Sequence, residues 1–225
     1  MFHVQLLPAG DSALLVQLPE RIDPDVNRWC LALGRVLAER VGSAIKDVVI
    51  GYCSVTVYFD PLSTDARWLE AEIRSIASDI GELAGEAGGF VEVPVCYGGE
   101  FGPDLADVAR FGNCSDEEVI AIHSSATYRV YMVGFVPGFA YLAEVDRRIA
   151  APRRASPRTA VPAGSVAIAG CQTGIYPSGT PGGWNIIGRT PVKPYDPSRR
   201  EPFLLKAGDR VRFRPIDSAE FLAHS

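Results

Sequence analysis

The sequence predicts an α+β fold in two domains, a small N-terminal α+β domain over residues 1–85 and a β-barrel domain over residues 90–225. The first domain is predicted because two pairs of short apolar runs each precede a helical pattern. Four glycines then fall between Gly81 and Gly89, where the chain offers little to bury. After Phe90, short alternating runs and frequent turn residues are typical of a β-barrel or sandwich.

The first domain follows the order strand, strand, helix, twice. Asp23 can cap the first helix, Pro24 suits its first position, and Gly42 can end it. The second helix carries its apolar residues, Trp68 among them, on one stripe, so both helices are expected on one face of a sheet. The predicted strands are 2–7, 13–18, 48–52 and 55–59, and the predicted helices are 24–41 and 62–83.

Residues 85–89 are predicted to link the two domains, and the charge changes there. Up to Gly89 the chain has 7 Lys and Arg against 13 Asp and Glu, whereas from Phe90 onward it has 15 against 14. The formal net charge of the whole chain is −5, so bulk attraction to nucleic acid or to a membrane is not expected.

The second domain opens with a strand over 90–95, two short helices over 103–110 and 116–124, and a strand over 127–133. Ser115 and Glu118 have the spacing of a capping box. A late strand over 210–214 places Val211 and Phe213 inward and its three arginines outward.

Composition excludes several classes of protein. The 5 cysteines are odd in number and widely spaced, and only 3 histidines occur, so neither a disulfide framework nor a metal site is predicted. The N-terminus lacks the basic region and long apolar core of a signal peptide, and no run of 18 apolar residues occurs. We therefore expect a cytoplasmic protein.

The stretch from Gly134 to Pro191 holds 16 of the chain's 39 Gly and Pro residues. Proline fixes φ and glycine supplies positive φ, so this stretch is expected to form a set of defined turns and not a helix. Aromatic residues lie next to several of these glycines and prolines, and five arginines lie within residues 147–158. Such a surface suits an anionic or carbonyl-bearing ligand. The alternative is a loop-rich barrel with ordinary turns and a solvated basic face.

Two groups of side chains are candidates for chemistry. His123, followed by Ser124 and Ser125, could form an acid/base pair, although a histidine near a helix C-terminus is more often a capping cation. Arg153 and Arg158 lie beside prolines that fix the backbone, so either could bind a carboxylate or phosphate bidentately. Arg147 and Arg148, near acidic residues, are expected in a solvated turn.

The segment Gly182-Gly183-Trp184 is the other candidate. Consecutive glycines let a backbone approach a ligand or partner closely, and Trp184 would add an apolar wall. A buried core tryptophan is an equally weighted alternative. We predict that this turn and the turn containing Arg153 and Arg158 flank one cleft.

Four segments resemble a known family: GFVPGFAYL (134–142), APRRASPRTAVPAGSVAIAG (151–170), QTGIYP (172–177) and PGGWNIIGRTP (181–191). They are similar to the PxpB family, the B subunits of 5-oxoprolinase, formerly called allophanate hydrolase subunit 1. The resemblance extends over essentially the whole chain. The family also includes KipI, an inhibitor of a histidine kinase.

The resemblance implies a cyclophilin-like fold for the β-barrel domain. It implies that the chain works with the A and C subunits (PxpA and PxpC) to cleave 5-oxo-L-proline to L-glutamate with consumption of ATP, whose site could lie on another subunit. The isolated chain is expected to be inactive. A KipI-like regulator of a sensor kinase is the alternative function, and prolyl isomerisation inferred from fold alone is weaker.

Motif positions supply the candidate site residues. The candidates for catalysis are His123, Arg153 and Arg158. The candidates for substrate or partner binding are Phe135, Pro137, Gly138, Phe139, Tyr141, Gln172, Tyr176, Gly182, Gly183, Trp184 and Arg189.

Overall fold

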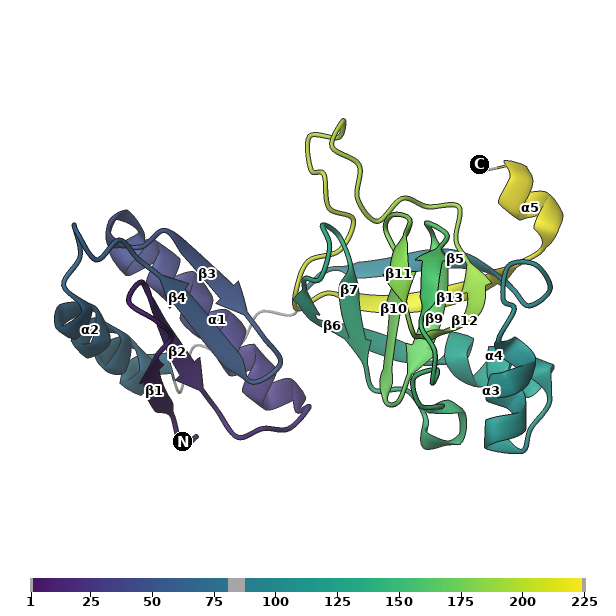
Figure 1. The fold of residues 1–225 in the computed structure, drawn as a ribbon, viewed down its shortest axis with the longest axis horizontal. Coiled ribbons are helices and arrows are strands. Elements are labelled where there is room, and N and C mark those ends of the chain that lie inside the picture. Colours follow the sequence, from purple (N-terminus) through teal and green to yellow (C-terminus); the bar gives the residue numbers. More distant parts are fainter. Residues whose placement is uncertain (1, 81–87, 224–225) are drawn as a thin grey trace. The chain divides into compact units, whose positions relative to one another are not determined.

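The computed structural model describes residues 2–80 and 88–223 and divides into two compact units, Met1–Ala87 and Gly88–Ser225 (Figure 1). Of the predicted linker 85–89, residues 85–87 lie outside the described residues, as do residues 81–83 at the end of the second predicted helix. Each unit has its own hydrophobic core.

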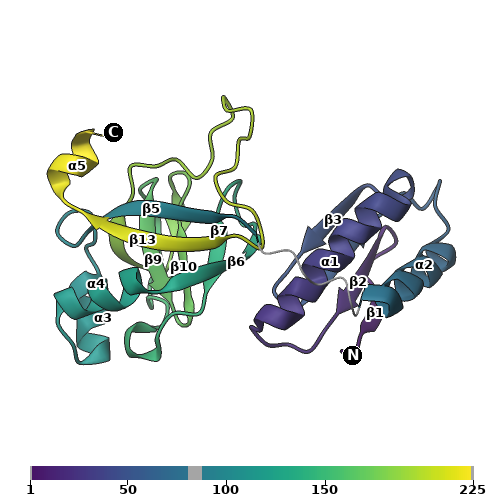
Figure 2. The ribbon, with the colours of Figure 1, turned by 180° about the vertical axis from the view of Figure 1, so that it is seen from behind.

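The first unit is an antiparallel sheet of four strands with both helices on one face, as the sequence predicts (Figure 2). The strands, in sheet order, are β1 (Gln5–Pro8), β2 (Ala13–Gln17), β4 (Ser54–Tyr58) and β3 (Asp47–Ile50), and the helices are α1 (Pro24–Val41) and α2 (Ala66–Asp79), with a short 3₁₀ turn η1 (Gly42–Ala44) after α1.

Aspartate caps begin both helices. The Asp23 carboxylate accepts hydrogen bonds from the amides of Asp25 and Val26, which confirms the predicted start of α1. The predicted start of α2 at Leu62 is wrong. Residues 61–64 form a turn after Asp60, and the Asp65 carboxylate caps the helix by accepting from the first free amides of α2. Trp68 is 44% exposed, so its predicted place on the buried stripe is also wrong.

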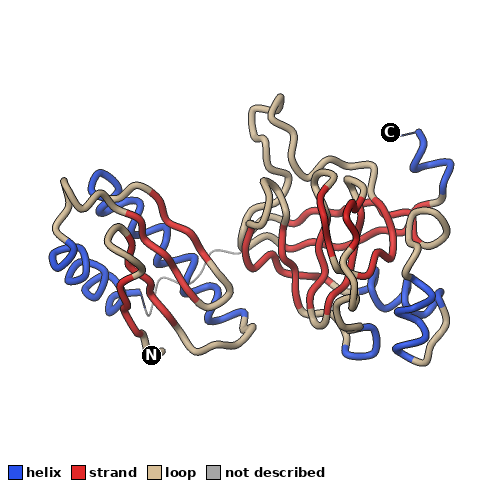
Figure 3. Tube along the Cα trace, in the orientation of Figure 1, coloured by secondary structure: helices blue, strands red, loops and turns tan. Residues whose placement is uncertain are grey.

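The second unit is a closed barrel of seven strands (Figure 3). Around the barrel the order is β10 (Gln172–Ile175), β7 (Ala140–Ala143), β6 (Thr127–Val133), β13 (Arg210–Ile216), β5 (Phe90–Tyr97), β12 (Asn185–Arg189) and β9 (Ser165–Ala169). A separate pair is formed by β8 (Arg158–Val161) and β11 (Thr180–Gly182), and the helical segments are α3 (Leu105–Gly112), α4 (Asp116–Ser125), η3 (Arg147–Ile149) and α5 (Ser218–Ala223).

The first and last strands of this unit are neighbours. β5 and β13 pair in parallel from Phe90 opposite Arg210 to Cys96 opposite Ile216. Val211 and Phe213 are buried and the arginines of β13 point outward, as predicted. The barrel is therefore closed by its own ends.

The stretch predicted to consist of turns also holds strands β7 to β12. Along these strands alternate residues enter two different clusters: Val166 and Ile168 of β9 fill the barrel interior, whereas Ala167 and Ala169 belong to a smaller cluster on its outer face. Val161 of β8 belongs to the same outer-face cluster, so the β8–β11 pair packs on this face as a second layer.

A truncated protein beginning at Gly88 is expected to fold alone, because the barrel closes on itself and has a separate core. Its single tryptophan, Trp184, is 5% exposed and reports on the outer layer. Urea unfolding followed by Trp184 fluorescence should show one cooperative transition. A gradual change without a cooperative transition would contradict the separation of the two cores.

Candidate functional site

The outer-face cluster is built around Phe139, which comes directly before β7. Its ring contacts those of Tyr141, Tyr176 and Trp184 edge to face, with ring centroids 4.8, 5.1 and 5.4 Å apart. Edge-to-face contacts of this kind stabilise aromatic side chains by more than the burial of their surface area alone. Phe139, Tyr176 and Trp184 are buried, so the core interpretation of Trp184 holds and only Tyr141 is partly open.

Gly182 is required by this arrangement, because a β-carbon at this position would overlap the hydroxyl and ring of Tyr176. Gly183 fixes the neighbouring loop by accepting a hydrogen bond from the Arg154 amide (N to O 2.8 Å). Gly182 also lies opposite Arg158 in the β8–β11 pair. The two turns that the sequence analysis singled out are therefore hydrogen-bonded side by side.

Asp104, at the start of α3, holds residues 151–158, which we call the arginine loop, against the barrel. Its side chain is 3% exposed. It accepts from Nη1 and Nη2 of Arg158 and from Nη1 of Arg154, each at 2.8 Å, and from the amide of Ile186 in β12 at 2.7 Å. Hydrogen bonding to Asp104 raises the pKa of the Arg158 guanidinium. Such a buried carboxylate is stable only when it is paired and hydrogen-bonded.

The predicted site arginines therefore have different environments. Arg158 is engaged with Asp104, whereas Arg153 is exposed and has no hydrogen bond or ion pair to any residue within 2–80 or 88–223. The sequence analysis missed Arg154 and Asp104, which lie 50 residues apart. As predicted, Arg148 lies in a solvated turn, where its hydrogen bond to Asp146 lowers the pKa of that carboxyl to about 2.

The positive charge of Arg153 acts on two tyrosines of the outer-face cluster, Tyr141 and Tyr176. Burial raises the pKa of Tyr141 and of Tyr176, and the nearby positive charge of Arg153 partly opposes this shift in both. Both hydroxyls are accordingly protonated at neutral pH.

Phe135 has an unusual backbone conformation. Its φ is +69°, and its side chain is 62% exposed while its ring contacts Phe139 at 5.7 Å. The turn is closed by backbone hydrogen bonds between residues 134 and 139. Gly138 is fixed against the loop over 194–195, because a β-carbon there would collide with Tyr195. Pro137 is exposed on the same turn. A positive φ at a bulky residue costs free energy, and residues in such strained conformations are concentrated at functional sites.

His123 lies inside the barrel, so its interpretation as a capping cation is wrong. The side chain is fully buried and stacks on Phe213 with ring centroids 4.6 Å apart. The Thr173 hydroxyl donates to the Ala167 carbonyl at 3.0 Å, so it accepts from Nε2–H of His123 at 2.9 Å. Nδ1 then accepts the Tyr97 hydroxyl at 2.8 Å.

Burial lowers the pKa of His123 to about 3, so the ring is neutral at physiological pH. Ser124 and Ser125 do not pair with it, since their hydroxyls donate to carbonyls of their own helix. His123 lies four residues after the buried Val119 and so on the same face of α4, a helical signal for burial that the sequence analysis did not use.

The remaining predicted residues lie apart from the arginine loop. Gln172 is partly buried on β10, next to the barrel strands β7 and β9. The Arg189 side chain donates to the Ala163 carbonyl at 2.8 Å and lies over the Phe221 ring of α5.

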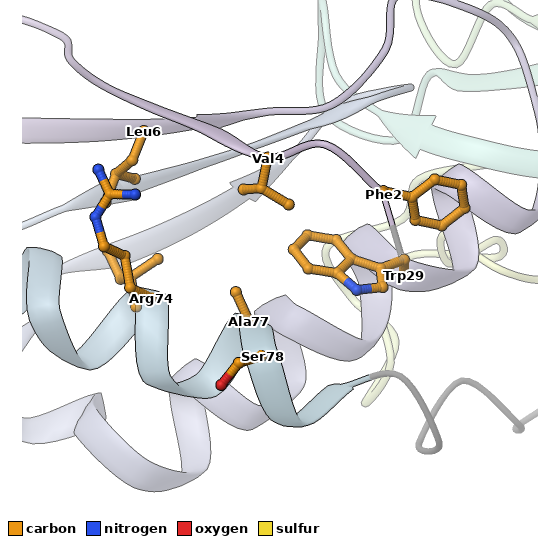
Figure 4. Close-up of a pocket in the computed structure, with 8 residues that line it drawn as sticks. Phe2, Val4, Leu6, Trp29, Arg74, Ala77 and Ser78 are labelled. Atoms are coloured by element: carbon orange, nitrogen blue, oxygen red, sulfur yellow. The ribbon is translucent and has the colours of Figure 1, made fainter.

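Two hollows bear on the choice of site. One, of about 430 Å³, lies between α3 and the arginine loop in the second unit. The other, of about 220 Å³, lies in the first unit between β1 and helices α1 and α2, where Figure 4 shows apolar side chains around Trp29 and Phe2. Arg74, the charged group on its lining, donates to Glu70. Of these two hollows, the arginine-loop pocket is therefore the better candidate for chemistry.

The described residues 2–80 and 88–223 contain no group of three or more His, Cys, Asp or Glu side chains arranged to hold a metal ion. Within the same residues, no helix is both long and apolar enough to span a bilayer.

The architecture defines a class of protein with a small α+β unit and a closed barrel that carries an aromatic and arginine-rich outer layer. Residues 4–205 match the family model of the carboxyltransferase domain, subdomain C and D. The chain is 42% identical to the 5-oxoprolinase B subunit of Bacillus subtilis, over 98% of this chain and 96% of that one. It is 40% identical to the 5-oxoprolinase B subunit of Haemophilus influenzae, over 93% and 97%.

A solved structure of TTHA0988 superposes with a TM-score of 0.82 at 39% identity, covering 92% of this chain. The match spans only 40% of the TTHA0988 chain. The chain therefore belongs to the family of carboxyltransferase subdomains C and D that includes the 5-oxoprolinase B subunits.

Removing the Asp104 charge should destabilise the barrel unit. Asp104→Asn leaves two arginines without their buried counter-charge and is expected to lower the free energy of unfolding by roughly 2–3 kcal/mol. The loss is smaller than for a fully buried ion pair because the arginines are partly exposed. Asp107→Asn is the matched control, since Asp107 pairs with Arg110 at the surface and should cost under about 0.5 kcal/mol. Urea unfolding measures both, and equal stability of the two variants would contradict the role of Asp104.

His123 should make the protein less stable in acid. Its pKa is about 3 when folded and about 6.5 when unfolded, so between these values the unfolded state binds the extra proton. Its contribution to stability is present above pH 6.5 and is lost by up to about 1.4 kcal/mol per pH unit as the pH falls from 6 to 4. Unfolding free energies of wild type and His123→Gln should converge over this range. Parallel pH profiles would contradict a buried neutral imidazole.

Proposed function

We propose that this chain is the B subunit of an ATP-dependent 5-oxoprolinase, which cleaves 5-oxo-L-proline to L-glutamate together with the A and C subunits. The observation that carries the proposal is the 42% identity to a 5-oxoprolinase B subunit over 98% of the chain. A match over both units supports a shared role for the whole chain and not only a shared fold.

The chemistry of the reaction is compatible with the groups on the outer face. Hydrolysis of a lactam needs activation of its carbonyl, and ATP can supply this by phosphorylating the carbonyl oxygen. Guanidinium groups and backbone amides stabilise phosphate and developing oxyanion charge. The arginine loop offers such groups next to α3. No self-contained nucleophile motif occurs in the sequence, so the complete reaction is assigned to the assembly.

Reconstitution tests the proposal. The chain is co-expressed with candidate A and C subunits, and ATP-dependent release of glutamate from 5-oxo-L-proline is measured. The complete assembly should release glutamate, whereas the purified chain alone should give none above background. Full turnover by the single chain would contradict the subunit role, and no turnover by an intact three-component assembly would contradict the proposed function.

A further inference from the structure

The pocket between α3 and the arginine loop combines three kinds of lining group. Phe111 of α3 contributes an aromatic ring, Arg153 and Arg154 contribute guanidinium groups, and Ser156 and Asn185 contribute neutral polar groups. Its volume of about 430 Å³ lies in the range of sites for small ligands.

The charge around this pocket favours an anion. The loop carries Arg153, Arg154 and Arg158, and the one buried carboxylate that pairs with them, Asp104, leaves two positive charges in excess. The acidic residue on the pocket lining, Asp107, is paired with Arg110. Arg153 alone among these arginines lacks a hydrogen bond or ion pair within the described part of the chain, so its guanidinium can take a carboxylate.

Two polar groups of the pocket, Arg154 and Asn185, are held in place before any ligand binds. Asp104 fixes Arg154 through its Nη1. The amide Nδ2 of Asn185 donates to the carbonyls of Pro152 and Ile168 at 2.8 and 3.2 Å, which leaves Oδ1 as the acceptor that Asn185 can offer. Groups fixed in this way lose little entropy on binding.

Phe111 supplies the apolar part of the site. Phe111 is 52% exposed, whereas Leu105, Val108 and Ala109 of the same helix are buried. An exposed aromatic ring on a pocket wall can cover the methylene groups of a small ring. Cation, hydrogen-bonding amide and apolar wall together match a small lactam that carries a carboxylate.

We infer that this pocket binds 5-oxo-L-proline, with the guanidinium of Arg153 holding the substrate carboxylate and Phe111 covering its ring. This inference rests on the proposed function and assigns the substrate-binding role to the chain itself. Arg153 is then a specificity-determining residue, and Arg158 acts indirectly by holding the loop through Asp104.

Titration calorimetry on the full chain tests the binding directly, with 5-oxo-L-proline, 2-pyrrolidinone, which lacks the carboxylate, and inorganic phosphate as probes. Wild type should prefer 5-oxo-L-proline to 2-pyrrolidinone by at least about tenfold, and Arg153→Ala should weaken binding of 5-oxo-L-proline by about 10- to 150-fold. Arg147→Ala, an exposed arginine of the same stretch, is the matched control and should bind as wild type does. Phosphate binding as tight as that of 5-oxo-L-proline would overturn the lactam assignment.

The reconstituted assembly separates this inference from the proposed function. Arg153→Ala should raise KM for 5-oxo-L-proline by at least about tenfold, while Arg147→Ala leaves KM unchanged. If the wild-type assembly releases glutamate but Arg153→Ala keeps the wild-type KM, the pocket is wrong and the function stands. Absence of binding by the isolated chain together with an unchanged KM in the assembly would also overturn the inference.

Discussion

The buried charge of Asp104 is the constraint on which the outer layer of the barrel depends. A carboxylate that is 3% exposed needs several donors, and the protein supplies two arginines and the Ile186 amide. Because the arginines belong to the loop before β8 and to the start of that strand, and the amide belongs to β12, satisfying this one group brings three distant segments together. The position of the loop is thereby fixed by electrostatics and not by apolar packing alone.

The hydrogen bonds to Asp104 also determine which arginines remain available to a ligand. Arg154 and Arg158 both donate to Asp104, so the guanidinium left for a ligand within the described part of the loop is that of Arg153. In the aromatic cluster around Phe139, the Tyr176 ring leaves no room for a β-carbon at Gly182. Inside the barrel, His123 serves packing and hydrogen bonding as a neutral ring. The candidate chemistry therefore lies on the outer layer.

Local signals in the sequence predicted most of the fold. The Asp23 cap and the capping box at Ser115 form as predicted, because each depends on residues only a few positions apart. The family motifs directed attention to the arginine loop. The ion pair between Asp104 and Arg158 was not predictable, because a contact across 54 residues leaves no periodic pattern in the sequence. The hydrogen bond between His123 and Thr173 was not predictable for the same reason, since the two residues are 50 positions apart.

Hydrogen exchange tests the anchoring role of Asp104 most directly. The amide of Arg154 donates to Gly183 and that of Ile186 to the Asp104 carboxylate, so both report on the contact between loop and barrel. In Asp104→Asn these two amides should lose protection while those of the β5–β13 pair keep most of theirs. Unchanged protection at Arg154 and Ile186 would contradict the claim that this carboxylate holds the outer layer in place.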